Sequence, residues 1–165
     1  MSMATKTIFK GSVITDGAIP LGVGVHLEGR ALSITGAITD SSLTANISLG
    51  CGEPILSGPT DPILGDSIDY FGIFTTAGAV TNTGTTDVHS NVGSDNGAVS
   101  GFDPAFVIDT IHSIPDAITA QAALDLDALY ADLNSMPVDI ELLSPTTFGN
   151  SLVLTPHVYL LSAST

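Results

Sequence analysis

The sequence predicts a mainly β protein that folds as a β-solenoid, with three short strands in each coil and one long helix packed along one face. Three observations predict this fold. An aliphatic composition is combined with many threonines, serines and glycines, which is typical of sheets with frequent turns. A tripeptide of Gly-Ala followed by Ile or Val recurs at a fixed spacing. One segment has the three- and four-residue spacing of an amphipathic helix.

Composition limits both the architecture and the partners. A chain of 165 residues can bury a sizeable core, and we expect residues 1–165 to form a single domain. Hydrophobic residues make up 44% of the chain but aromatic residues only 5%, so that core is aliphatic. Seventeen acidic residues stand against three basic ones, and the net charge of -14 argues against nucleic acid or an anionic membrane as a partner.

Two further features concern the cellular location. Cys51 is the single cysteine, so no disulfide can form within the chain. No run is apolar enough to span a membrane, and residues 1–11 lack the apolar segment of a secretory signal. We therefore expect the chain to be either cytoplasmic or a mature or engineered piece of an exported protein.

The Gly-Ala tripeptides begin at residues 17, 36, 78 and 97, so each of the two pairs is offset by 19 residues. The first pair lies in a longer match between residues 9–19 and 27–38, with one inserted residue. In that match Phe9 corresponds to Leu27, Gly11 to Gly29, Val13 to Ala31 and Ile14 to Leu32. A repeat of this length is too short for a helical repeat and suits one coil of a β-solenoid. Chance recurrence of common residues is the alternative.

A Gly- and Pro-rich segment, residues 49–65, separates the two pairs and is interpreted as a linker. Residues 116–135, after the second pair, are predicted to form the helix, with Ser113 as its N-cap. Its apolar stripe consists of Ile118, Ala122, Leu126, Leu129 and Leu133. The stripe must be buried against one solenoid face, which is then closed to a ligand.

Strand alternation predicts a flat, uncharged surface on another face. If Ile38 and Val80 point inward, the side chains expected outward are Thr35, Ala37, Thr39, Thr75, Ala77, Ala79, Thr81 and Thr83. The same rule places outward Ala18, Pro20, Ala98 and Ser100. A different, ordinary solvated face is expected to carry Lys10, Ser12, Glu28 and Arg30. A rigid array of methyls and hydroxyls can order a layer of water and thereby bind ice. The alternative is that threonine is simply a favourable exposed strand residue.

The sequence carries no recognisable pattern for catalysis or for a cofactor. The spacing of metal ligands is not found among the histidines His26, His89, His112 and His157. Asp87, Asp95 and Asn96 are of the types that bind calcium, but their spacing does not match an EF-hand loop, and turn chemistry explains them. We therefore expect no enzyme, no metal and no cofactor.

Several motifs together resemble the DUF3494 family of ice-binding proteins. Residues 64–102, which include "AGAVTNTG" and "SGF", resemble the beginning of the family module, as do the helical residues 119–134 and "LTPHVY" at 154–159. His157 stands where the family has Gly. Residues 3–39, which include "GRALSITGAIT", resemble the end of the module. The resemblance implies a right-handed, discontinuous β-solenoid with a long helix along one face, and ice binding through another face rich in Thr and Ala. We expect an extracellular location.

The order of the parts departs from the family. The closing part, residues 1–48, precedes the opening part, residues 66–165, and the middle of the module is missing. The chain is then a circular permutant, the junction of two tandem modules, or a piece completed by a second chain. In the last case, open solenoid ends invite head-to-tail stacking as a homo-oligomer.

The leading functional hypothesis is a non-enzymatic protein that adsorbs to ice and inhibits its growth or recrystallisation. The first rival is a structural adhesin or self-stacking filament module with the same fold. The second is a β-helix protein that binds or cleaves carbohydrate, which the absence of Trp disfavours.

Overall fold

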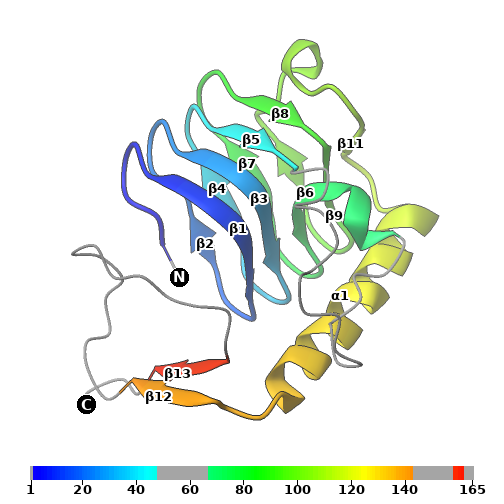
Figure 1. Cartoon of the computed structure of the whole chain (residues 1–165). Coiled ribbons are helices and arrows are strands. Elements are labelled where there is room, and N and C mark those ends of the chain that lie inside the picture. Colours follow the sequence, from blue (N-terminus) through cyan, green and yellow to red (C-terminus); the bar gives the residue numbers. More distant parts are fainter. Residues whose placement is uncertain (1, 48–66, 143–157, 162–165) are drawn as a thin grey trace. The chain divides into compact units, whose positions relative to one another are not determined.

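The structure is a computed structural model and describes residues 2–47, 67–142 and 158–161 (Figure 1). The chain divides into two compact units, Met1–Tyr130 and Ala131–Thr165. The expected linker at 49–65 lies outside the described residues. In the second unit, β12 (Ile140–Leu142) pairs in parallel with β13 (Tyr159–Leu161).

The first unit is a β-solenoid in which parallel strands stack along three faces (Figure 1). Two long strands, β1 (Ile8–Thr15) and β3 (His26–Ser33), each run through two of the faces. The first face contains their first halves together with β5 (Thr44–Asn46) and β8 (Asp87–His89). The second face contains their second halves together with β6 (Phe71–Thr75), β9 (Asn91–Ser94) and β11 (Ile111–His112). The third face contains β2 (Ile19–Pro20), β4 (Ile38–Asp40), β7 (Val80–Asn82) and β10 (Val99–Ser100).

The strand register confirms the repeats inferred from the sequence. Phe9 pairs with Leu27, Gly11 with Gly29, Val13 with Ala31 and Ile14 with Leu32. The last residues of the four Gly-Ala tripeptides form one column of the third face, in the order Ile19, Ile38, Val80 and Val99. The two pairs of repeats therefore belong to one continuous stack.

The strands on either side of residues 48–66, β5 and β6, belong to one coil. Ala45 of β5 pairs with Leu27 on the first face, while Ile73 of β6 pairs with Ala31 on the second face. Because Leu27 and Ala31 belong to the same strand, β5 and β6 are successive parts of the third coil. β6 therefore continues the coil to which β5 belongs.

Glycines and small hydroxyl residues build the corner between the second and third faces. A Cβ atom on Gly36 or Gly97 would overlap the backbone of the preceding coil, so only glycine allows the coils to stack there. The hydroxyl groups of Ser33, Thr75 and Ser94 donate to the carbonyl oxygens of Gly17, Gly36 and Gly78, at 3.1, 2.9 and 2.8 Å. Each coil is thus bonded to the coil before it by a buried side chain as well as by its backbone.

The helix α1 (Ala117–Ser135) packs on the second face and lies within one residue of its expected bounds. Its buried residues are Thr119, Ala122, Ala123, Leu126 and Leu129. Of these, Ala122, Ala123 and Leu126 form a cluster with Leu32 and Phe74 of the solenoid. Ile118 was expected in the stripe but is 48% exposed. The stripe is rotated because Thr119 is buried in its place.

The expected N-cap, Ser113, is wrong, because Asp116 occupies that position. The Asp116 carboxylate accepts hydrogen bonds from the backbone N–H groups of Ile118 and Thr119, at 2.8 and 2.9 Å. The Thr119 hydroxyl accepts in return from the backbone N–H of Asp116, at 2.9 Å. This reciprocal pair satisfies the first turn of the helix. Within the described residues, no helix is both long and apolar enough to cross a membrane.

Candidate functional site

The outward side of the third face carries two columns of small side chains. In strand register, the first column consists of Ala18, Ala37, Ala79 and Ala98, and the second of Pro20, Thr39, Thr81 and Ser100. All eight residues are exposed or half-buried, and none is charged. Four parallel strands about 4.8 Å apart support the columns. The result is an uncharged surface of small side chains, in which methyl and hydroxyl groups are joined by the ring of Pro20.

Three more expected residues lie at the margins of this surface, where the strands meet the corners. Thr35 and Ala77 precede β4 and β7, Thr83 follows β7, and all three are exposed. The Thr35 hydroxyl donates to the carbonyl oxygen of Asp16 at 2.6 Å, and the Thr83 hydroxyl donates to that of Asp40 at 3.3 Å. These hydroxyls are held along the stack.

The expectation that Thr75 points outward is wrong. Thr75 is fully buried, and its hydroxyl is bonded to Gly36 within the corner. β6 ends at Thr75, and a bend separates it from Val80 at the start of β7. Side chains alternate only within one strand, so the phase is not carried across the bend. Thr75 therefore does not belong to the surface.

Two polar residues of the third face point inward beneath it. Asp40 and Asn82 are neighbours in the stack, and each is only 4% exposed. The Thr86 hydroxyl lies 3.0 Å from Asp40 Oδ1 and 2.6 Å from Asn82 Oδ1, and its single proton can serve one of them at a time. Burial raises the pKa of Asp40 to about 6, although the hydrogen bond with Thr86 lowers it. No ionisable group of these strands therefore reaches the outward surface.

The first face differs sharply in charge. Lys10 pairs with Glu28 at 2.7 Å, and Asp87 lies 3.4 Å from His89. The hydrogen bond from Lys10 lowers the pKa of Glu28. Lys10 and Ser12 are exposed as expected, but the Arg30 side chain is only 12% exposed. Its guanidinium is bound by the carboxylate and carbonyl of Asp69, so Arg30 is less solvated than expected.

The second face is covered by α1, as the sequence predicted, so it is closed to a ligand. The third face is thus the one that is both uncovered and uncharged over the described residues of the first unit. It combines strands from both sides of residues 49–65, because β4 lies directly beside β7.

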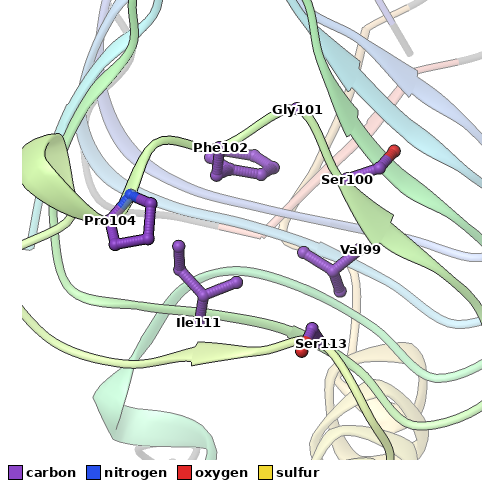
Figure 2. Close-up of a pocket in the computed structure, with 7 residues that line it drawn as sticks. All are labelled: Val99, Ser100, Gly101, Phe102, Pro104, Ile111 and Ser113. Carbon is purple, nitrogen blue, oxygen red and sulfur yellow. The ribbon is translucent and has the colours of Figure 1, made fainter.

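The described residues bring together no group of three or more potential metal-binding side chains. His26 and His89 lie on the first face, whereas His112 is buried beside Phe71 and lies 2.7 Å from the Asp116 carboxylate. His157 and Cys51 lie outside the described residues. A pocket at the β10 end of the stack is lined by Val99, Ser100, Gly101, Phe102, Pro104, Ile111 and Ser113 (Figure 2). Its walls are largely apolar and contain no acid or base.

No family model matches this sequence, and no curated protein matches it. Among solved structures, the fold is similar to the crystal structure of an ice binding protein from an Antarctic bacterium, Flavobacteriaceae, with 38% sequence identity and a TM-score of 0.59. The similarity covers 87% of this chain but 38% of the other chain. The present chain therefore spans less than half the length of that protein. The match agrees with the β-solenoid and single helix expected from the sequence.

Proposed function

We propose that this protein binds ice through the outward side of its third face and so restrains the growth or recrystallisation of ice crystals. The observation that carries the proposal is the pair of small-residue columns, which runs unbroken across four coils. The proposed contact residues are Thr35, Ala37, Thr39, Ala77, Ala79, Thr81 and Thr83, extended by Ala18, Pro20, Ala98 and Ser100. The similarity to an ice binding protein supports the same reading.

The physical argument rests on flatness and on the absence of charge. A charged side chain binds its own hydration shell tightly, which would disrupt an ordered water layer, and this face presents none. Water molecules form an ordered cage around the alanine methyl groups, and the threonine hydroxyls can form hydrogen bonds with the water molecules of that cage. The strands fix the spacing of both groups, so that little side-chain freedom is lost on binding. The proposed activity is physical adsorption and involves no catalytic step.

The proposal includes membership in the DUF3494 family, with its two parts in permuted or tandem-junction order, and an extracellular place of action. The coil shared by β5 and β6 supports the altered order, because the later residues complete a coil that the earlier residues begin.

The test is thermal hysteresis and ice recrystallisation measured on the wild type and on Thr39→Tyr and Thr81→Tyr. A tyrosine ring projecting from the centre of a flat face should keep the ice lattice away and abolish most of the activity. Thr44→Tyr is the matched control, because Thr44 lies outward on the first face in the same solenoid. Circular dichroism verifies that each variant is folded.

Wild-type protein that shows neither hysteresis nor recrystallisation inhibition overturns the proposed function and favours the structural module. Activity that survives both third-face tyrosines, but is lost in Thr44→Tyr, places the ice contact on the first face instead.

A further inference from the structure

Over the described residues of the first unit, the strands at both ends of the solenoid have one edge without a neighbouring strand. Among the described strands, β1 pairs only with β3 at one end, while β10 and β11 each have one neighbour at the other end (Figure 1). The free side of an edge strand carries backbone N–H and C=O groups that can pair with another chain.

Partly buried apolar side chains lie at these ends of the core described for the first unit. Its partly buried members are Phe9 at the β1 end and Val99, Phe102 and Ile111 at the other end. The latter three meet Pro104 around the pocket, with a volume of about 310 Å³ (Figure 2). The pocket exists because the fifth coil has Val107 on the first face and β11 on the second, but no described strand on the third.

The β1 end carries the missing piece. Met3 forms a parallel bridge with Leu21, donating to the carbonyl oxygen of Pro20 and accepting from the N–H of Gly22, both at 2.9 Å. Met3 thus belongs to a further coil, of which the structure describes a part on the third face. One end of the stack lacks a third-face strand, and the other end supplies one.

From this complementarity we propose that copies of this chain associate head to tail into one continuous solenoid. Residues 2–4 of one copy lie on the free edge of β10 in the next copy. The strand β1 of the first copy lies on Val107 and β11 of that next copy. The core of one copy then continues into the core of the other, and Phe9 and Met3 cover the pocket.

Exposed apolar side chains match in this arrangement. Ile8 is 70% exposed and begins a row that continues through His26, Thr44 and Asp87. The bridge between Val88 and Val107 places Phe106, which is 43% exposed, next in that row. Stacking brings Ile8 of one copy onto Phe106 of the other, so that two exposed apolar groups become neighbours.

The charges of the ends also match. Lys6 is exposed in the connection between the third and first faces at the β1 end. Asp103 is exposed in the same connection at the β10 end. All three basic residues of the chain precede β4, whereas Asp103 and Asp109 lie near the opposite end. Head-to-tail contact brings Lys6 of one copy close to Asp103 of the other.

The association is heterologous, so it leaves a free end at each step and does not stop at a dimer. It stands independently of ice binding, because it uses the ends of the stack rather than a face. If both proposals hold, the third faces of successive copies join into a longer surface.

Sedimentation velocity of the full chain from micromolar to millimolar concentration tests the proposal. The weight-average sedimentation coefficient should rise with concentration beyond that of a dimer. Backbone N–H groups of successive strand residues point to opposite edges of the strand. Met3 points toward Leu21, so the N–H of Ala4 points toward the free edge, and Ala4→Pro removes it. We expect its association constant to fall by roughly tenfold or more.

Asp103→Asn provides a second variant that keeps the local fold. The Asp103 side chain accepts from the N–H of Ala105 at 2.9 Å, and the asparagine oxygen can do the same while the charge is lost. Asp127→Asn, on the exposed side of α1, is the matched control with an equal change of net charge. Asp103→Asn should weaken association, whereas the control should not.

Protein that stays monomeric at millimolar concentration overturns the proposal, as does association that ends at a dimer. Wild-type association that is unchanged in both Ala4→Pro and Asp103→Asn also overturns it, because the contact then lies elsewhere.

Discussion

Asp40→Asn is expected to stabilise the protein above pH 6 and to have little effect in acid. Asp40 is 4% exposed, and its Oδ2 atom has no hydrogen-bond partner among the described residues. The equivalent residue of the next coil is already an asparagine, Asn82, whose amide donates to the carbonyl oxygens of Gly84 and Gly101 at 3.0 and 2.8 Å. An amide at residue 40 is therefore compatible with the stack.

The magnitude follows from the pKa of Asp40, which burial raises from 3.8 to about 6. A raised pKa means that the folded state prefers the neutral acid, so stability falls as pH rises from the unfolded pKa to the folded pKa. The difference of about 2.2 pKa units corresponds to roughly 3 kcal/mol of lost stability above pH 6. Below about pH 3.8 the acid is neutral in both states and the loss disappears.

Urea unfolding at pH 8 and at pH 3.5 measures this effect. At pH 8 the variant should gain up to roughly 3 kcal/mol in the free energy of unfolding, and at pH 3.5 almost nothing. The exposed Asp127→Asn serves as the control and should change little at either pH. Equal shifts at the two pH values would refute the argument, because they would show that Asp40 is not a buried carboxylate destabilised by its charge.

Three further predictions concern the corner and the helix. Thr75→Val should lower the free energy of unfolding by roughly 1–3 kcal/mol, because the Gly36 carbonyl loses a buried hydrogen-bond partner. Thr39→Val, on the surface, is the control. Equal effects of the two substitutions would contradict the buried position of the Thr75 side chain. Gly78→Ala should cost roughly 3 kcal/mol in the same assay, since its Cβ would lie 2.6 Å from the Gly36 carbonyl oxygen; a neutral result would mean that the coils can move apart. Asp116→Ala should cost roughly 1 kcal/mol at pH 7 through loss of the cap. The hydrogen bond with His112 lowers the pKa of Asp116, so this contribution is present above about pH 4 and is lost as pH falls through the folded value. A cost that persists at pH 2 would argue against capping by the ionised carboxylate.

The coil repeat could be predicted from the sequence because the column positions are occupied by similar residues. Phe9 and Leu27 occupy the same core position in successive coils, as do Val13 and Ala31. An alignment of the two repeat sequences therefore also gives the register of the two strands. The helix was predictable for a similar reason, since its spacing of apolar residues is local. Both inferences needed only the spacing at which similar residues recur along the sequence.

The errors arose where two local rules meet. Thr75 was placed outward because alternation was extended through a bend, and its buried role depends on the Gly36 carbonyl of another coil. Ser113 was chosen as the cap by residue type, whereas Asp116 is fixed by its reciprocal bonds with Thr119. That β5 and β6 belong to one coil could not be predicted, because it depends on β3 spanning two faces and pairing with β5 on one and with β6 on the other.

The third coil is divided between β5 and β6. The order of segments along the chain is therefore independent of the order in which the coils stack. The solenoid is held together by contacts between neighbouring coils, and those across β3, β4, β6 and β7 do not require the peptide that connects the two parts. A chain cleaved within residues 49–65 should therefore remain one particle under native conditions. For such a fold, the connecting peptide sets only the effective concentration of the two complementary fragments. The gene can therefore be divided and rejoined at this point during evolution without a change in how the coils pack.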